Sequence, residues 1–333
     1  MKTMPAQDAY PALIGDIGGT NARFGLVPEK RSAPLEIRTL ANASYPSLVA
    51  ALGHYLGLVG GARPRRACIA VAGPVEIGRF HLTNRPQWDT DLASVAKAHG
   101  LSVLTVLNDF EALAESVPLL GEQELVPVGG ERAADAVAPK AVLGPGTGLG
   151  IGVAVRTAVG WMAVPGEGGH MELASTDPLG TAAIAHERKI RGRASAERFL
   201  SGPGIERLHL ALGEVQDRPR EPVTAAVLSE RAFAGDADAR QTVRMFFTLL
   251  AGLAGDVALL FGARGGVFLG GGVTERLANL LDHRAFREAF ENKGRLKPYL
   301  AAIPVHLIAA EMPALRGCAA HLERLGAAPP EGV

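Results

Sequence analysis

Two glycine-rich stretches have the composition of phosphate-binding turns. They are Gly15–Asn21 (GDIGGTN) and Gly144–Gly150 (GPGTGLG), and each lies between two short apolar runs that predict strands. A glycine turn lets phosphate oxygens approach backbone N–H groups, and the threonine in each stretch adds a hydroxyl donor. Asp16 can reach a hydrated divalent cation on the phosphates. A single glycine cluster is most often an ordinary turn, but the repetition favours two hairpins that bind a nucleotide triphosphate.

A second candidate is the pair Asn108-Asp109, which directly follows the apolar run Val103–Leu107. That run predicts a buried strand, and open α/β sheets place ligand sites at the carboxyl ends of their strands. Asp109 is ionised at neutral pH and can accept a proton from an attacking hydroxyl, while Asn108 can orient the same substrate. The simpler interpretation is that Asp109 caps the helix expected to begin at Phe110, and both roles are compatible.

Two further glycine-rich segments carry weaker signals. Gly166–His170 places Glu167 and His170 in a loop with little other side-chain bulk, which suits a polyhydroxyl ligand, although such an acid is often merely solvated. His170 has no second histidine or cysteine at a metal-ligand spacing. Gly270–Gly272 follows a predicted strand and lets adenine or ribose approach the backbone; an ordinary turn is the alternative. By its residues alone, Glu197 is an exposed helix acid.

The elements around these motifs alternate between strands and helices. Apolar runs predict strands at residues 67–72, 80–83, 103–107, 161–164, 266–269 and 305–308, besides those of the two hairpins. Helical spacing or start signals predict helices at residues 45–59, 92–99, 110–116, 178–191, 204–212, 239–263, 274–281, 284–292 and 314–325. This alternation predicts an α/β fold with mixed sheets. The irregular stretch 118–139 predicts a domain junction near residue 119.

Composition narrows the class of protein. A chain of 333 residues, 47% hydrophobic and 20% charged, is long enough for two globular domains. Lysine plus arginine and aspartate plus glutamate both number 34, so no net field favours nucleic acid or an anionic membrane. Cys68 and Cys318 are expected to be buried thiols, and Met245–Ala263 a buried core helix rather than a membrane span. Met1–Tyr10 lacks a signal-peptide pattern, and a strand beginning by Ala12 leaves no room for a helix-turn-helix domain, so we expect a cytoplasmic enzyme.

The order of the motifs closely resembles the bacterial glucokinase family, in the branch outside the zinc-containing ROK kinases and within the hexokinase–actin–Hsp70 superfamily. The resemblance extends from about Leu13 to Leu325. It implies a two-domain actin-like ATPase (ribonuclease H-like) fold, each domain a mixed sheet flanked by helices, with a cleft between them. The expected parts are a small domain at 1–119, a large domain at 120–309 and a C-terminal helix at 310–333 that returns to the small domain.

The resemblance also implies roles for individual residues. Asp109 matches the catalytic base for the sugar 6-hydroxyl, and Asp16 lies near magnesium that is carried by ATP and reached through water, with no direct metal ligand from the protein. The implied sugar ligands are Asn84, Asn108, Asp109, Glu167, His170 and Glu197, of which Asn84 is the weakest candidate. The implied nucleotide-binding residues are Gly15, Asp16, Ile17, Gly18, Gly19, Thr20, Gly146, Thr147, Gly148, Gly270, Gly271 and Gly272.

The function implied by the resemblance is ATP-dependent phosphorylation of D-glucose at the 6-hydroxyl, giving glucose 6-phosphate and ADP as the first step of glycolysis. A kinase of this kind uses ATP and Mg²⁺, and the family implies a homodimer. Two alternatives stay open: a kinase for another hexose, such as mannose or fructose, and a non-catalytic sugar sensor on the same fold. Intact phosphate turns and the Asn108-Asp109 pair argue against the sensor.

Overall fold

The chain forms two compact units that alternate along the sequence. The structure is a computed structural model that describes residues 10–73, 75–76, 79–80, 88 and 90–326. Unit 1 comprises Met1–Leu119, Ala154–Pro165 and Glu311–Val333, and unit 2 comprises Leu120–Val153 and Gly166–Ala310. The sequence analysis assigns residues 154–165 to the large domain, whereas their contacts group them with unit 1.

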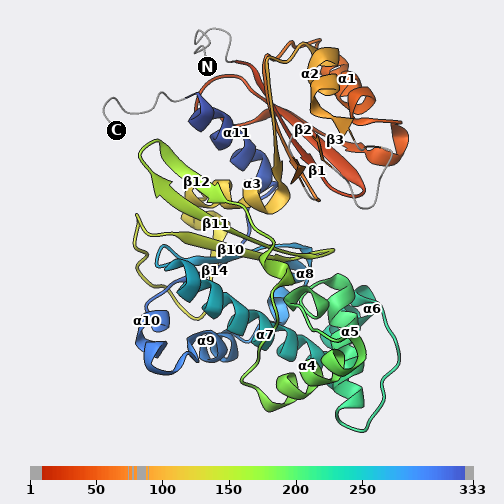
Figure 1. The fold of residues 1–333 in the computed structure, drawn as a ribbon, viewed down its shortest axis with the longest axis vertical. Helices are drawn as coiled ribbons and strands as arrows, with labels where there is room; N and C mark the ends of the chain where they lie inside the picture. Colours follow the sequence, from red (N-terminus) through yellow and green to blue (C-terminus); the bar gives the residue numbers. More distant parts are fainter. Residues whose placement is uncertain (1–9, 74, 77–78, 81–87, 89, 327–333) are drawn as a thin grey trace. The chain divides into compact units, whose positions relative to one another are not determined.

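Unit 1 is built on a five-stranded mixed sheet in the order β3-β2-β1-β4-β8 (Figure 1). β1 pairs antiparallel with β2 and parallel with β4, and β8 is parallel to β4. Every residue of β4 is buried, as its continuous apolar run predicts for a strand covered on both faces. The strands are β1 (Ala12–Ile17), β2 (Asn21–Val27), β3 (Leu35–Ala41), β4 (Arg66–Val71) and β8 (Val103–Asn108). A small second sheet contains β5 (Val75–Glu76), β6 (Arg79–Phe80) and β7 (Thr90–Asp91).

Helices cover both faces of the large sheet in unit 1. α1 (Leu48–Leu58) and α2 (Leu92–His99) pack against one face, where the core includes Leu13 and Ile17 of β1. α3 (Asp109–Ser116) and α11 (Pro313–Leu325) pack against the other face, where the core includes Ala12 and Ile14. Alternate residues of β1 therefore serve the two cores, as expected for a strand with helices on both sides.

The contact between α3 and α11 is unusually close. A Cβ built on Gly317 of α11 would lie 1.8 Å from the carbonyl oxygen of Ala112 in α3, so the crossing requires glycine. The next residue, Cys318, is a buried free thiol whose Sγ donates to the carbonyl oxygen of Gly15 at 3.4 Å. The C-terminal helix thus reaches the strand that leads into the first glycine turn.

A buried carboxylate joins α3 to the same helix. Glu115 is 2% exposed, and its Oε1 accepts hydrogen bonds from Arg324 Nη2 at 2.5 Å and from the backbone N–H of Ala163 at 3.3 Å. His321 Nδ1 lies 3.3 Å from the same oxygen. Burial works to raise the pKa of Glu115, but the hydrogen bonds from His321 and Arg324 hold it below its usual value. Glu115 is therefore ionised in the interior of unit 1.

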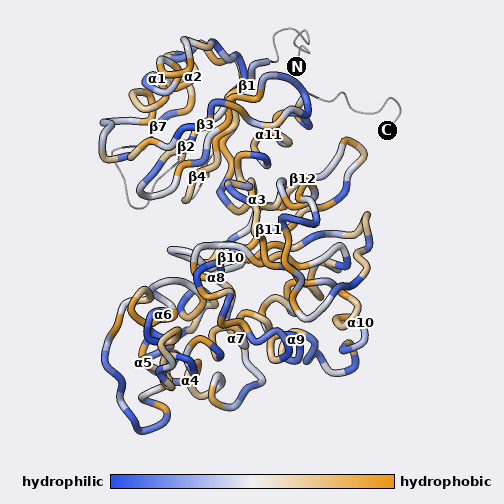
Figure 2. The backbone as a smooth tube through the Cα atoms, turned by 180° about the vertical axis from the view of Figure 1, so that it is seen from behind, coloured by the Kyte–Doolittle hydropathy of each residue, from blue (hydrophilic) through white to orange (hydrophobic). Residues whose placement is uncertain are grey.

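A second mixed sheet has the order β12-β11-β10-β13-β14-β9, and its strands β9, β10, β13 and β14 belong to unit 2. β10, β13 and β14 run parallel, and β9 pairs antiparallel with β14 at one edge. Figure 2 shows that hydrophobic backbone positions concentrate on the inner strands and helices of each unit. The strands are β9 (Leu125–Pro127), β10 (Lys140–Pro145), β11 (Leu149–Thr157), β12 (Gly160–Val164), β13 (Val267–Leu269) and β14 (Val305–Ile308). The two mixed sheets with flanking helices confirm the predicted α/β class.

The helix α7 (Ala237–Phe261) is the core helix of unit 2. It is long and apolar enough to cross a membrane by length and composition, but 67% of its apolar window is buried inside the protein. It packs against α5, α6 and α9. The other helices of unit 2 are α4 (Pro178–Arg191), α5 (Gly202–Glu214), α6 (Ala225–Ala234), α8 (Gly272–Leu277), α9 (His283–Glu291) and α10 (Lys297–Ala301).

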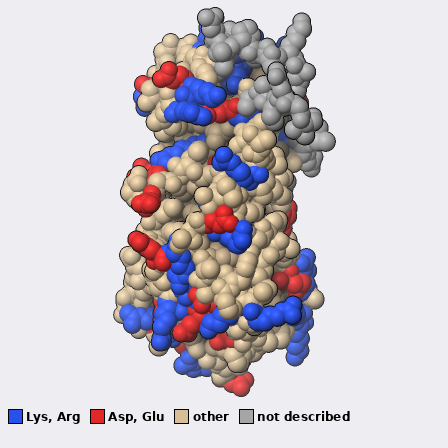
Figure 3. All heavy atoms as spheres, turned by 90° about the vertical axis from the view of Figure 1, so that its left-hand side faces the viewer, with Lys and Arg blue, Asp and Glu red and all other residues tan. Residues whose placement is uncertain are grey.

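Charged side chains of both signs are interspersed on the face drawn in Figure 3. The 34 basic and 34 acidic residues of the chain balance. An evenly mixed surface of this kind gives little long-range attraction for a polyanion such as nucleic acid.

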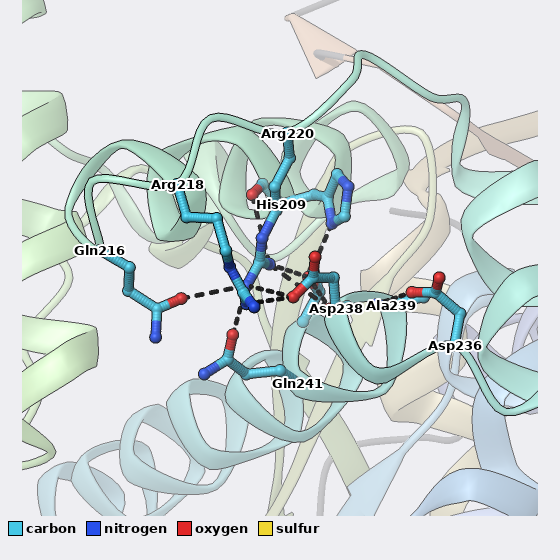
Figure 4. A network of polar contacts seen from close by, with 9 residues as sticks. His209, Gln216, Arg218, Arg220, Asp236, Asp238, Ala239 and Gln241 are labelled. Carbon is cyan, nitrogen blue, oxygen red and sulfur yellow. Dashed lines mark hydrogen bonds and ion pairs between the residues drawn. The ribbon is translucent and has the colours of Figure 1, made fainter.

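One buried arginine fixes the connection between α5 and α6 (Figure 4). The Arg220 side chain is 2% exposed, and it contacts the start of α7 through Asp238 at 3.3 Å and through Thr242 Oγ1 at 3.1 Å. It also donates to Gln216 Oε1 and to Gln241 Oε1. The guanidinium therefore ties a surface segment to the core helix of unit 2.

The crossing at Gly317 leads to a stability prediction. We expect Gly317→Ala to lower the free energy of unfolding by about 1–3 kcal/mol, because the new methyl group would overlap the Ala112 carbonyl and push α11 away from α3. Gly57→Ala is the matched control: Gly57 also lies inside a helix, but its Cβ would meet nothing within 4 Å. The control should raise stability by about 0.5–1 kcal/mol. Urea unfolding measures both changes, and equal effects of the two substitutions would contradict the close crossing.

Candidate active site

The first glycine turn is shorter than the motif that predicted it. Gly18, Gly19 and Thr20 alone connect β1 to β2, and the N–H of Gly18 donates to the carbonyl oxygen of Asn21 at 2.9 Å. Gly15 lies inside β1, where a Cβ would come within 3.1 Å of the Phe24 ring. Gly15, Asp16 and Ile17 were predicted as part of the phosphate loop, but the structure places them in the strand that supports the turn.

Asp16 is the acidic group closest in sequence to this turn. It is paired across the hairpin with Arg23, whose Nη1 lies 3.3 Å from Asp16 Oδ2. The Asp16 side chain is only 18% exposed. Burial raises the pKa of Asp16 above its usual value, and the charge and hydrogen bond of Arg23 offset this only in part. Arg23 therefore offsets only part of the cost of burying the negative charge of Asp16.

The structure brings the first turn and Asp109 to the same edge of the sheet. In the parallel strands Ile17 pairs with Val71, and Val71 pairs with Asn108, so β1, β4 and β8 end at the same level. Two strand spacings separate Ile17 from Asn108, or about 10 Å. In unit 1 the glycine turn thus follows the end of β1 and the predicted base follows the end of β8, with only β4 between these two strands.

Asn108, not Asp109, is the N-cap of α3. The Oδ1 of Asn108 accepts from the N–H of Phe110 at 2.9 Å, and its Nδ2 donates to the carbonyl oxygen of Gly73 at 3.3 Å. Asp109 is half-buried at the first position of the helix, and its Oδ1 also accepts from Phe110 N–H, at 3.0 Å. The capping role that the sequence offered for Asp109 therefore belongs to its neighbour. A carboxylate at a helix N-terminus is stabilised in its ionised form.

The second glycine turn, Gly146–Gly148, connects β10 to β11 in unit 2. The N–H of Gly146 donates to the carbonyl oxygen of Gly148 at 2.8 Å and closes the turn. From outside the turn, the N–H of Gly202 at the start of α5 donates to the carbonyl oxygen of Gly146 at 2.8 Å. Both glycine turns are therefore strand–turn–strand hairpins, as the sequence predicts.

Glu197 lies directly against this second turn. Its Oε2 accepts from the N–H of Leu149 at 3.0 Å, and a Cβ on Gly148 would lie 2.6 Å from the same oxygen. The sequence alone gave Glu197 no role beyond that of an exposed acid, and only the family resemblance selected it. The contact with Leu149 comes from tertiary structure and has no local sequence signal.

The loop with Glu167 and His170 also packs on the start of β11. A Cβ on Gly169 would lie 2.0 Å from the carbonyl oxygen of Leu149, so the loop requires glycine there. The N–H of Ala196 donates to the carbonyl oxygen of Met171 at 2.8 Å, which joins the end of this loop to the short helix Ala196–Arg198. The side chains of Glu167 and His170 are exposed. Glu167, His170 and Glu197 thus come from segments that are linked at one end of β11.

The Gly270–Gly272 turn lies beside the end of β10. The N–H of Gly270 donates to the carbonyl oxygen of Leu143 at 2.9 Å. Gly271 has a φ of 84°, and its Cβ would come within 2.4 Å of the Pro145 carbonyl oxygen. Glycine is therefore required at position 271 by conformation and by space. The predicted adenosine segment is adjacent to the second glycine turn.

The predicted sugar ligand Asn84 lies outside the described residues. Among the described residues, no group of three or more histidine, cysteine, aspartate or glutamate side chains is arranged to hold a metal ion. Asp16 supplies a hard carboxylate oxygen, the ligand type that Mg²⁺ prefers, and Mg²⁺ commonly binds through one or two carboxylates and water. Its incomplete compensation by Arg23 fits a site that accepts a hydrated cation.

Comparison with known proteins shows the family to which this chain belongs. The family model for glucokinase matches residues 13–325. The chain belongs to the glucokinase family. It is 43% identical over 317 residues to a glucokinase of Chromobacterium violaceum, with 95% of this chain and 90% of that protein covered.

Solved structures agree with this family. A glucokinase from an Antarctic psychrotroph matches with a TM-score of 0.86 and 36% identity over 93% of this chain and 98% of that chain. A ROK family glucokinase from Streptomyces griseus, in complex with glucose and AMPPNP, matches in fold with a TM-score of 0.60 and 22% identity, covering 94% of this chain and 99% of that chain. These findings confirm the predicted actin-like ATPase fold class and support a glucose kinase, and they do not favour the alternatives of another hexose kinase or a sensor.

The raised pKa of Asp16 predicts a pH-dependent stability difference. Below the pKa of the unfolded state, the carboxyl group is protonated in both states and no charge is buried. As the pH rises through the folded-state pKa, the buried group ionises and stability is lost. Without nucleotide or divalent cation, Asp16→Asn should therefore be more stable than the wild type at pH 7, by a margin that shrinks toward pH 3.

Urea unfolding across this pH range measures that margin. Asp282→Asn is the control of opposite sign, because backbone hydrogen bonds, first from Ala285, lower the pKa of Asp282. Removing that charge should cost stability at pH 7. A margin for Asp16→Asn that is constant with pH would contradict the role of its ionisation.

The contact of Glu197 with the second turn gives another prediction. Glu197→Ala should lower the free energy of unfolding by about 1–3 kcal/mol, because the buried N–H of Leu149 loses its acceptor. Glu197→Gln keeps an acceptor oxygen and should stay near the wild-type stability. Thermal unfolding of both variants checks this, and an equal loss in both would show that the charge, not the hydrogen bond, matters for stability.

Proposed function

We propose that the chain transfers the γ-phosphoryl group of ATP to the 6-hydroxyl of glucose, with Asp109 as the general base. The observation that carries the proposal is the alignment of the ends of β1, β4 and β8, which brings the first glycine turn and Asp109 to one edge of a sheet. A kinase needs phosphate-binding amides and an acceptor for the hydroxyl proton in the same region. Family membership supplies the substrate.

In the proposed reaction, the Asp109 carboxylate accepts the proton of the 6-hydroxyl while that oxygen forms a bond to the γ-phosphorus. The bond between the γ-phosphorus and the bridging oxygen breaks, and ADP leaves. Asn108 supports Asp109 by capping α3 and binds the sugar. Backbone N–H groups of Gly18–Thr20 and Gly146–Gly148 stabilise the charge on the phosphate chain. Bound Mg²⁺ would neutralise phosphate charge, with Asp16 as its partner through water.

We assign the remaining contacts as the family resemblance implies. Glu167, His170 and Glu197 bind sugar hydroxyls, with Asn84 as an additional ligand. Gly270–Gly272 accepts the adenosine end of the nucleotide, which its position beside Pro145 and the second turn supports. The ROK family structure in complex with AMPPNP supports an adenine nucleotide as phosphoryl donor.

The cellular setting follows from the same resemblance. We propose that the enzyme acts in the cytoplasm as a homodimer and supplies glucose 6-phosphate as the first step of glycolysis. The balanced surface charge supports a small-molecule substrate rather than nucleic acid or membrane as its partner. Light scattering tests the dimer, and a mass of 34.7 kDa in solution would contradict it.

ADP release with Mg-ATP and a panel of sugars tests the activity. Glucose should support the fastest turnover, and mannose, fructose and N-acetylglucosamine should be poorer, because unmatched hydroxyls leave buried polar groups unpaired. Turnover with another hexose alone would replace glucose as the substrate. Glucose binding without any turnover would favour a sugar sensor.

The role of Asp109 gives a separate prediction. Asp109→Asn should lower kcat by about 10²–10⁴-fold, because the amide cannot accept the hydroxyl proton, while the dissociation constant for glucose changes little. Glu111→Gln, which removes a neighbouring carboxylate of α3, is the control and should keep most of the wild-type kcat. Steady-state kinetics and glucose titration measure the two effects. Near-normal turnover in Asp109→Asn would refute the assignment.

A further inference from the structure

Asn42 makes two contacts with the first glycine turn that no motif predicts. It follows directly after β3 and is 1% exposed. Its Nδ2 donates to the carbonyl oxygen of Gly18 at 2.8 Å, and its backbone N–H donates to the carbonyl oxygen of Thr20 at 2.9 Å. One residue therefore holds a carbonyl group at each end of the three-residue turn.

These contacts set the direction of an amide that could bind phosphate. A trans peptide unit is planar, and its C=O and N–H point in opposite directions. A hydrogen bond from Asn42 to the Gly18 carbonyl therefore directs the N–H of Gly19 away from Asn42. In the part of the chain that the structure describes, no hydrogen bond within the protein takes up the N–H groups of Gly19 and Thr20, and both residues are exposed.

Glycine peptides need such a restraint more than others. Gly18 and Gly19 lack a Cβ, so their peptide unit can rotate between several orientations at little steric cost. A turn that samples several orientations must be ordered when it binds phosphate, and that ordering weakens binding. The side chain of Asn42 removes this freedom before the ligand arrives.

The buried side chain of Asn42 contributes a hydrogen-bond donor, its Nδ2, and not an acceptor. Among the described residues its Oδ1 is buried without a hydrogen-bond partner, which is unfavourable for a polar atom. An apolar side chain would avoid that cost but could not donate to Gly18. The amide group therefore contributes through its Nδ2, to a carbonyl oxygen of the turn.

We infer that Asn42 is a positioning residue for nucleotide binding, which fixes the Gly18–Gly19 peptide so that the turn presents its N–H groups to the phosphate chain. The inference rests on the proposed function, because it assigns a phosphate ligand to the Gly18–Thr20 turn. Asn42 itself touches the turn and not the reacting atoms.

Two substitutions and one control test the role of Asn42. Asn42→Ala removes the side-chain amide, and Asn42→Leu keeps most of its volume but loses the donor without adding a charge. Tyr55→Phe is the matched control, because the hydroxyl of buried Tyr55 also donates to a backbone carbonyl oxygen of unit 1, that of Glu36 at 3.2 Å. For each protein, calorimetry gives the dissociation constants of Mg-AMPPNP and of glucose, and steady-state kinetics give KM for ATP and for glucose.

Loss of the donor should weaken nucleotide binding selectively. We expect the dissociation constant for AMPPNP and the KM for ATP to rise about five- to tenfold in both Asn42 variants, as for one lost buried hydrogen bond. The glucose constants should stay within about twofold of the wild type, and Tyr55→Phe should change neither ligand. A merely structural role would affect both ligands alike.

Unchanged nucleotide affinity in a folded Asn42 variant would overturn the inference, as would parallel losses for AMPPNP and glucose. If Asn42→Ala does not fold, Asn42→Leu decides by the same criteria. Binding of the analogue is measured without turnover. A wild-type protein that binds AMPPNP but does not phosphorylate glucose would therefore contradict the proposed function, while the titrations would still decide the role of Asn42.

Discussion

A flexible turn binds an anion more tightly when the peptides that carry its N–H groups are held in one orientation before the ligand arrives. Both glycine turns of this chain meet that constraint with a donor from elsewhere in the same unit. In unit 1 Asn42 Nδ2 binds the Gly18 carbonyl, and in unit 2 the N–H of Gly202 binds the Gly146 carbonyl. The Gly18–Gly19 and Gly146–Thr147 peptide units then direct the N–H groups of Gly19 and Thr147 away from these donors. The rest of each sheet serves to hold these turns in place.

The proposed base in unit 1, Asp109, depends on the same framework. Asp109 begins α3 where β8 ends, and α3 is fixed by the close crossing at Gly317 and by the ionised Glu115. Because β1, β4 and β8 are hydrogen-bonded in register, a shift of α3 would move Asp109 relative to the glycine turn. The buried C-terminal helix α11 therefore contributes to catalysis in the proposed mechanism, although its residues carry no chemistry there.

The sequence predicted the elements with strong local signals and missed those whose signal is tertiary. Continuous apolar runs located β4 and β8, and glycine clusters between two apolar runs located both hairpins, because apolar strands and tight turns leave clear local patterns. β3 was missed because this edge strand is largely exposed; α6 was also missed, although Thr224 caps its start and Gly235 ends it. In the proposed site, Asp109 and the turns were proposed from their residues, whereas only the family resemblance selected Glu197. Asn42 could not be found from the sequence, because its partners lie more than 20 residues away and an isolated asparagine after a strand is common.

The central claim is that nucleotide phosphates bind to backbone amides of the two glycine turns. Amide resonances in ¹H–¹⁵N spectra test it most directly during a titration with Mg-AMPPNP. The account predicts that the signals of Gly19, Thr20, Thr147 and Gly148 shift together, with one dissociation constant that equals the value from calorimetry. Binding that leaves these four signals unchanged while amides elsewhere shift would contradict the account.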